Sequence, residues 1–280
     1  MKIFAIDIGG TKLKYALYDE KLNRLTCGES PSNAKYGAKM LIETAFGVFG
    51  DEQFDAIGIS TAGMVNKDGS IYYANENIPN YTGVKLKKIF EERYRVPVFV
   101  LNDISAGAIS ETECRKNDFY YLSLGTGVGG VMVNNGIPYI GENGAAGQIG
   151  YLPSLNGKFC IDKAASVSAL EKTGGKPAAE LFFAALNNDS NARKIISGWA
   201  KEVVYAISLA VGFYNPPTVV IGGGISWQKR VLIDFLMKEI DVLPKVYRAK
   251  LEIETAKEPS GVKGAAIYAK RCYYGNKREN

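Results

Sequence analysis

The sequence predicts an α/β protein made of two similar domains, and three observations support this prediction. Apolar runs of strand length alternate with longer stretches of helical periodicity, a pattern typical of sheets covered by helices. A glycine-rich turn joins two predicted strands near the start, in "DIGGTK", and again halfway along the chain, in "GTGVGG". The length of 280 residues, 46% of them hydrophobic, is enough for roughly two domains.

The first half begins with a predicted hairpin, because apolar residues alternate on both sides of the turn "GTK". A loop containing "NKDG" interrupts the later elements, and the last apolar strand, "VPVFVL", leads into Asn102 and Asp103. The elements expected in this half are strands at 2–9, 13–20, 22–30, 54–60 and 96–101, and helices at 33–48 and 83–94.

The second half repeats the same opening, with a strand, a glycine turn and another strand after a helix at 104–116. This weak repeat predicts two copies of one fold that face a shared cleft. Its elements are strands at 119–125, 130–136, 218–224 and 250–256, and helical segments at 164–214, 227–240 and from about 262. The expected domains are an N-terminal α/β domain at 1–109 and a C-terminal α/β domain at 110–261, with the helix at about 262–280 packing back on the first.

The composition excludes several kinds of site. The chain has no histidine, which excludes Ser-His-Asp and Cys-His catalysis and leaves Asp, Glu, Lys, Tyr or Cys for proton transfer. A carboxylate is the expected base. The four cysteines (Cys27, Cys114, Cys160 and Cys272) are scattered without a C-x-x-C pair, so neither structural zinc nor a disulfide framework is expected.

The two ends of the sequence bear on location and partners. The opening "MKIFAIDIGGTK" soon reaches an acid and two glycines, so it fits neither a signal peptide nor a membrane span, and a cytoplasmic location is expected. The net charge of +5 comes partly from "KRCYYGNKREN", which we interpret as a solvated tail. No nucleic-acid or membrane partner is expected.

The stretch "LSLGTGVGGVMV" contains G-x-G-x-x-G, the fingerprint of dinucleotide-binding proteins. That fingerprint needs a helix after the glycine turn, because the helix N-terminus holds the pyrophosphate. Here Gly130 is followed by "VMVNNGIPYI", which is typical of a strand. An NAD-dependent dehydrogenase is therefore disfavoured. A glycine turn between two strands can still bind phosphate through backbone N–H groups, or be only structural, and the presence of two such turns favours phosphate binding.

Six segments together resemble a known family. In order, they are "AIDIGGTK", "GISTAGMV", "VLNDISAGAISE", "LSLGTGVGGVMVNNG", "GAAGQIG" and "NPPTVVIGGGIS". The sequence is similar, from Met1 to about Ala269, to the ROK family of sugar kinases and sugar-responsive repressors, within the actin-like ATPase superfamily. This resemblance implies two RNase H-like domains with a central interdomain cleft.

The predicted base is Asp103. From the residues alone it is either a helix N-cap or a general base at the end of a parallel strand. The resemblance implies the base, with Asn102 and Gly63 contacting the sugar and Asp7 near the Mg²⁺–phosphate group through water. The ATP-binding residues it implies are Asp7, a first turn of Gly9, Gly10, Thr11 and Lys12, a second turn of Gly125, Thr126, Gly127 and Gly129, and Gly222, Gly223 and Gly224 at the adenosine. The alternatives are an ordinary surface lysine for Lys12 and a strand-to-helix turn for the last three glycines.

The sequence departs from the family pattern in one region. The usual G-E-x-G-H, zinc-binding cysteine cluster and second Glu are represented by Gln148, Tyr151, Cys160 and Asp162. The expectation is a site without zinc, in which Gln148 and Asp162 hydrogen-bond sugar hydroxyls and Tyr151 forms one wall. A different substrate, displaced contacts and loss of activity all remain open.

The predicted function is an ATP-dependent, Mg²⁺-requiring kinase that phosphorylates a hexose or hexose derivative. Glucose, N-acetylmannosamine, fructose and β-glucosides are the candidates, and a homodimer is expected. The alternative is a non-catalytic, sugar-binding regulatory member of the family. Repressors of the family carry a helix-turn-helix before the kinase-like region, and the first strand here begins at Lys2, so no DNA-binding domain is expected.

Overall fold

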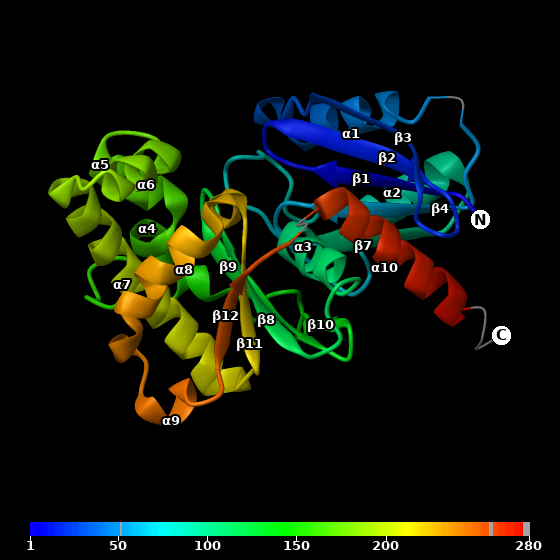
Figure 1. Ribbon diagram of the computed structural model, residues 1–280. Coiled ribbons are helices and arrows are strands. Elements are labelled where there is room, and N and C mark those ends of the chain that lie inside the picture. Colours follow the sequence, from blue (N-terminus) through cyan, green and yellow to red (C-terminus); the bar gives the residue numbers. More distant parts are fainter. Residues whose placement is uncertain (51, 258–259, 277–280) are drawn as a thin grey trace. The chain divides into compact units, whose positions relative to one another are not determined.

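The computed structural model describes residues 1–50, 52–257 and 260–276. It forms two compact α/β units (Figure 1). Unit 1 comprises Met1–Glu113, Ile140–Ala146 and Ser260–Asn280, and unit 2 comprises Cys114–Tyr139 and Gly147–Pro259. The chain thus passes to the second unit after α3 has ended, and Ile140–Ala146 groups with the first unit although it follows a strand of the second.

Unit 1 is built on a five-stranded sheet of order β3-β2-β1-β4-β7. β1 is antiparallel to β2, β2 to β3, and β1, β4 and β7 are parallel. The strands are β1 (Ile3–Ile8), β2 (Lys12–Tyr18), β3 (Arg24–Pro31), β4 (Ala56–Thr61) and β7 (Val98–Asn102), and the helices are η1 (Ala34–Tyr36), α1 (Ala38–Gly47), α2 (Leu86–Tyr94), α3 (Asp103–Glu111) and α10 (Gly261–Asn276).

Alternation along β1 separates the two faces of this sheet. Phe4, Ile6 and Ile8 belong to the core cluster that includes side chains of α1 and α2. Ile3 and Ala5 belong to the cluster formed with α3 and α10. Because successive side chains of a strand point to opposite faces, the next residue on the α3 and α10 side is Asp7.

Glycines allow α10 to lie very close to its neighbours in unit 1. A Cβ atom at Gly58 in β4 would overlap the Ala265 carbonyl, and one at Gly264 would overlap Ala106 of α3. Ser260 caps the helix by accepting a hydrogen bond from the Lys263 N–H (3.1 Å). The part of the predicted terminal helix beyond residue 276 lies outside the described residues.

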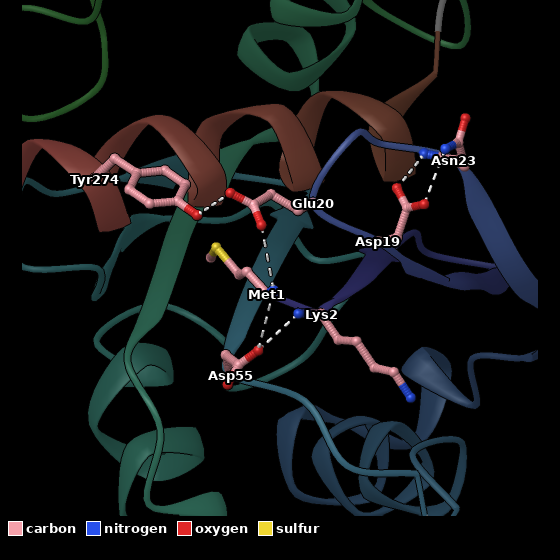
Figure 2. A network of polar contacts seen from close by, with 7 residues as sticks. All are labelled: Met1, Lys2, Asp19, Glu20, Asn23, Asp55 and Tyr274. Carbon is pink, nitrogen blue, oxygen red and sulfur yellow. Dashed lines mark hydrogen bonds and ion pairs between the residues drawn. The ribbon is translucent and has the colours of Figure 1, made fainter.

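A polar network holds the other end of α10 (Figure 2). The Tyr274 hydroxyl donates to Glu20 (2.6 Å), which lies 3.6 Å from the amino group of Met1. That amino group is 4.0 Å from Asp55, whose carboxylate also accepts from the Lys2 N–H (2.7 Å). The end of α10, the β2–β3 connection and the segment before β4 therefore meet at the start of β1.

Unit 2 repeats the topology of unit 1. Its sheet has the order β10-β9-β8-β11-β12, with an antiparallel β8-β9-β10 meander and parallel β8, β11 and β12. The strands are β8 (Phe119–Leu124), β9 (Val128–Asn134), β10 (Ile137–Tyr139), β11 (Thr218–Gly222) and β12 (Glu252–Thr255). The predicted α/β class with two similar domains is confirmed, and so is the internal repeat, while β10 is a strand that the sequence analysis did not predict.

The helical region predicted at 164–214 is four separate helices. Ser166 starts α5 as an N-cap, and two further breaks follow at Gly175–Pro177 and Asn187–Asp189. The helices of unit 2 are η2 (Ile149–Tyr151), α4 (Ile161–Ala165), α5 (Val167–Gly174), α6 (Ala178–Leu186), α7 (Ser190–Tyr214), η3 (Gly224–Gln228), α8 (Lys229–Lys238), η4 (Ile240–Val242) and α9 (Lys245–Arg248).

Helix α7 forms the centre of the unit 2 core. It contacts α4, α6 and α8, and its buried side chains join those of β8 and β11. An 18-residue stretch of α7 has a mean hydropathy of 1.3, so the helix is long and apolar enough to span a membrane. Half of that stretch is buried inside the protein. Its apolar character is explained by its place in the core.

The predicted "NKDG" loop is the turn of a short hairpin, β5 (Met64–Val65) and β6 (Ile71–Tyr73). The strands are too short for the alternation of apolar and polar residues to be recognised in the sequence. Gly144 of the segment Ile140–Ala146 packs against the backbone of Val65, and Lys67 pairs with Glu142 (2.8 Å). These contacts attach that segment to unit 1.

Candidate active site

Asp7 lies near the C-terminal end of β1, directly opposite Ser60 in the parallel register with β4. The buried Ser60 hydroxyl donates to Asp7 Oδ1 at 2.5 Å. Burial raises the pKa of Asp7, while the Ser60 hydrogen bond and the charge of Lys14 act in the opposite direction. Within the described residues no hydrogen bond reaches Oδ2, so this oxygen can accept from a ligand or a metal-bound water.

The first turn of α10 packs on the same carboxylate. A Cβ atom at Gly261 would lie 2.5 Å from Asp7 Cγ, so only glycine permits this approach. The positive end of the helix dipole favours the ionised form of Asp7. The polar side chains of β1 and β4 and the N-terminus of α10 thus form one cluster in unit 1.

The first glycine turn connects β1 to β2. The Gly9 N–H donates to the Lys12 carbonyl (3.0 Å), and the Thr11 carbonyl accepts from the Ser32 N–H (2.9 Å). Gly10 and Thr11 are exposed at the tip. The Lys12 ammonium pairs with Glu29 across the hairpin (2.6 Å), and both side chains are exposed.

Asp103 is the first residue of α3, immediately after β7. Its Oδ1 accepts from the Ile104 N–H (2.9 Å) and from the Asn102 side-chain amide (2.8 Å). Although the side chain is solvent-accessible, surrounding protein displaces much of its hydration and raises its pKa to about 7, and the charge of Asp7 adds to the rise.

Asn102 is buried and serves as the N-cap of α3. Its Oδ1 accepts from Ile104 N–H (2.9 Å) and Ser105 N–H (3.4 Å). Its Nδ2 donates to the Gly63 carbonyl (2.6 Å) as well as to Asp103. Gly63 has a φ of 94°, and a Cβ atom there would lie 2.8 Å from the Tyr73 carbonyl. Asn102, Asp103 and Gly63 are therefore brought together in unit 1.

The second glycine turn connects β8 to β9 in unit 2. Gly125 N–H donates to the Gly127 carbonyl (3.0 Å), Thr126 is exposed at the tip, and Gly129 lies in β9 opposite Ser123. Asp162, in α4, accepts from the Val128 N–H at 2.6 Å. Its carboxylate also lies against Gly127 and Gly150. The structure therefore joins Asp162 to the second turn.

The three glycines after β11 differ in what surrounds them. A Cβ atom at Gly222 would overlap the Tyr121 hydroxyl, and one at Gly223, whose φ is 80°, would overlap the Leu124 carbonyl. Gly224 has no protein atom within 4 Å of a Cβ position. Packing therefore explains why Gly222 and Gly223 must be glycine, whereas the fold gives no reason for glycine at position 224.

The residues that depart from the family pattern lie around η2. Gln148 is half-buried at the start of η2, and no hydrogen bond of its side chain is found in the described part of the chain. Tyr151 ends η2 with its side chain 55% exposed. Cys160 precedes α4 and is a free thiol. Among the described residues, no group of three or more His, Cys, Asp or Glu side chains could hold a metal ion.

Sequence reasoning missed Ser60, Gly261 and Gly150 at these clusters. Ser60 carried a detectable signal, because it is a polar residue at the end of an otherwise apolar strand run. The other two had none, since their roles depend on contacts with Asp7 and Asp162 that are distant in sequence.

Two units of identical strand order, each opening with a hairpin closed by a glycine turn, define a protein with the actin-like ATPase fold. Comparison with known proteins then identifies the family. The chain belongs to the ROK family, whose model matches residues 3–272.

Three relatives cover almost the whole chain. An uncharacterized protein of Clostridium perfringens is 34% identical over 95% of this chain and 97% of its own length. An N-acetylmannosamine kinase of Haemophilus influenzae is 27% identical over 96% of both chains. A glucokinase of Thermotoga maritima is 26% identical over 96% of this chain and 98% of its own length.

Solved structures share the fold. A ROK hexokinase from Thermus thermophilus is 26% identical, with a TM-score of 0.76 over 100% of both chains. A ROK family glucokinase from Streptomyces griseus, in complex with glucose and AMPPNP, has a TM-score of 0.82 at 21% identity and covers 97% of this chain and 100% of its own. At that identity the likeness concerns the fold alone.

Proposed function

We propose that the protein is an ATP-dependent kinase that transfers a phosphoryl group to a hydroxyl of a hexose or hexose derivative. The observation that carries this proposal is Asp103, a carboxylate at the end of a parallel strand whose Oδ1 is occupied by two donors and whose pKa is raised to about 7. A base with a pKa near the working pH is effective in proton transfer.

Open glycines support a nucleotide site. Gly10, Gly125 and Gly224 have neither a left-handed φ nor a protein atom within 4 Å of a Cβ position. The folded chain therefore does not itself require glycine at these three places, whereas a phosphate or adenosine lying on the backbone would. The nucleotide-binding set proposed here is the predicted one, with Gly222 and Gly223 shaping the backbone that carries Gly224.

In the proposed reaction the substrate O–H bond breaks and its proton moves to Asp103 as the oxygen bonds to the γ-phosphorus of ATP. The bond between that phosphorus and the bridging oxygen of ADP breaks, and its electron pair leaves with ADP. The contribution of the protein is mainly positioning and the stabilisation of charge on the transferring group.

Asp7 fits a role beside Mg²⁺, since its Oδ2, which has no hydrogen-bond partner among the described residues, can accept from a metal-bound water. Bound Mg²⁺ would neutralise phosphate charge. Asp7 would orient its water shell, and Ser60 would hold the carboxylate in place. Lys12 pairs with Glu29 at the exposed turn. In the proposed role, the Lys12 ammonium leaves Glu29 and binds a phosphate oxygen of ATP.

The proposed sugar site involves Gly63, Gln148, Tyr151 and Asp162. Gln148 is the strongest of these, because its half-buried amide makes no hydrogen bond within the described residues. Named relatives include kinases of glucose and of N-acetylmannosamine, and these two sugars head the candidates. We propose that the protein acts in the cytoplasm, as a homodimer that binds no zinc.

ATP turnover over a panel of glucose, N-acetylmannosamine, fructose and a β-glucoside, with excess Mg²⁺, tests the proposal. At least one sugar should stimulate ADP formation, and Asp103→Asn should lower that turnover by about 10²-fold or more while sugar affinity changes by less than about tenfold. Lys21→Gln, on the exposed β2–β3 connection, is a control expected to behave as wild type. Sugar binding by calorimetry with no turnover in the wild type would favour the regulatory alternative.

A further inference from the structure

Lys14 is an exposed lysine on the same face of the first sheet as Asp7. In β2, Ala16 and Tyr18 belong to the core cluster formed with α3 and α10, whereas Leu13 belongs to the cluster on the other face. Because side chains alternate along a strand, Lys14 points to the α10 side, as Asp7 does in β1.

A row of polar side chains crosses the sheet at this level. Lys14 lies directly opposite Asp7 in the antiparallel register of β2 with β1, and Asp7 lies opposite Ser60 in β4. Directly opposed residues of neighbouring strands have Cβ atoms about 5 Å apart. Burial raises the pKa of Asp7, and the positive charge of Lys14 is close enough to oppose that rise.

The ammonium group of Lys14 has no partner among the described residues. Its cross-strand neighbour on the other side is Glu29 in β3, but the Lys12 ammonium already pairs with Glu29 at 2.6 Å. No side-chain hydrogen bond or ion pair of Lys14 is found in residues 1–50, 52–257 and 260–276. Three N–H donors therefore remain for an anionic ligand beside the carboxylate proposed to lie near Mg²⁺.

Lys14 and Asp103 lie on opposite sides of Asp7. In the strand order, β2 flanks β1 on one side, whereas β4 and then β7 follow on the other, and Asp103 comes directly after β7. The attacking and leaving oxygens of a phosphoryl transfer lie roughly in line through the phosphorus. With the base at the end of β7 and the metal–phosphate group at Asp7, ADP leaves toward β2, the strand that carries Lys14.

We propose that Lys14 binds the β-phosphate of ATP and stabilises the negative charge that ADP acquires as it leaves. The proposal rests on the proposed kinase function and adds a residue that lies in neither glycine turn. As the bond from the γ-phosphorus to the bridging oxygen breaks, its electron pair moves onto ADP. Lys14 keeps its protons throughout and acts through its charge and hydrogen bonds.

Calorimetric titration with ADP and with AMP tests the contact without any turnover. Lys14→Met keeps a long side chain but removes the charge, and its exposed position predicts an unchanged Tm. The Kd for ADP should rise about tenfold or more, because a charge-assisted hydrogen bond to phosphate is lost. The Kd for AMP, which has no β-phosphate, should change less than about twofold, and Lys14→Arg should keep most of the ADP affinity.

The matched control is Lys39→Met. Lys39 is an exposed lysine of α1, the helix that covers the opposite face of the same sheet. This variant removes one positive charge from unit 1 at a distance from Asp7, so ADP should bind as it does to wild type. Equal losses of ADP affinity in Lys39→Met and Lys14→Met would reduce the effect to net charge and overturn the proposal.

Repeating the ADP titration in EDTA separates a direct contact from an effect that acts through Asp7 and Mg²⁺. If Lys14 contacts the phosphate itself, the loss of affinity in Lys14→Met persists when Mg²⁺ is removed. A loss that disappears in EDTA would show that Lys14 acts only by way of Asp7, and it would overturn the proposal. Unchanged ADP affinity in Lys14→Met, or an equal loss for AMP, would do the same.

Turnover tests the leaving-group role. At saturating ATP and sugar, kcat of Lys14→Met should fall about tenfold or more, because ADP carries more charge in the transition state than in bound ATP. An unchanged kcat would overturn this role. Wild type that binds ADP through Lys14 but turns over no sugar would count against the kinase function and still support the phosphate contact, whereas wild type that binds no ADP would overturn both.

Discussion

Asp103 and Asp7 both carry raised pKa values, and the charge of Asp7 contributes to the value of about 7 at Asp103. A general base acts in its ionised form, so kcat/KM should fall as the pH drops through about 7 and approach tenfold per pH unit below it. Asp7→Asn removes the neighbouring charge and should move this acidic limb to lower pH. Rate profiles from pH 5 to 9 check both effects, and a flat profile across this range would remove Asp103 as the base.

The same carboxyl should cost stability at neutral pH. Its pKa is about 7 in the folded protein and about 4 in unfolded chains, so the folded state holds a proton that the unfolded state has lost between these values. Stability therefore decreases as pH rises from about 4 to 7. Asp103→Asn should raise Tm at pH 8, with a smaller gain at pH 5. Melting curves of both proteins test this, and a variant that melts at or below wild type at pH 8 would contradict it.

Among the elements, the β1–β2 turn offers a test of ligand contact without a folding penalty. A methyl group at Gly10 would meet no protein atom within 4 Å, so Gly10→Ala should leave Tm nearly unchanged. It would occupy the space in which a phosphate approaches the backbone, so KM for ATP should rise about tenfold or more. Gly198→Ala, at an equally open position in α7, is the control: ATP kinetics should stay normal and Tm should rise, because alanine favours helix. Normal ATP kinetics in Gly10→Ala would place the phosphates elsewhere.

The same elements show what could be predicted from sequence. The two hairpins that carry the glycine turns and the parallel strands were predictable because alternation and turn residues are local signals, whereas the short β5–β6 hairpin was not. An N-cap was foreseen at this junction but on Asp103, whereas the structure gives that role to Asn102, whose bond to Gly63 joins residues 39 apart. Asp162 was expected at the sugar, and its bond to the Val128 N–H could not be foreseen because it depends on how α4 meets β9. Both contacts join residues that are distant in sequence, so no local sequence pattern predicts them.

For the whole molecule, stability and turnover should be independent of zinc. Structural zinc needs about four Cys or His ligands close together. The chain has no histidine, and Cys160 stands alone in the region that corresponds to the cysteine cluster of the family. A zinc-selective chelator, with Mg²⁺ in excess, should leave Tm and turnover unchanged. Stoichiometric zinc found by metal analysis, together with loss of Tm on chelation, would refute this.

The packing of α10 also has a consequence for how the molecule is made. One face of the first sheet, with Ile3 and Ala5, is covered by Val262, Ala265 and other residues near the end of the chain. On a ribosome the strands of unit 1 emerge first, but α10 follows all of unit 2 in the chain and is synthesised after it. Helix α3 is already present to cover part of that face, but the part that α10 covers stays apolar and open while unit 2 is synthesised. A chain interrupted shortly before α10 would carry a finished second unit and an unfinished first one, which makes the exposed face a marker by which chaperones and proteases can recognise incomplete translation.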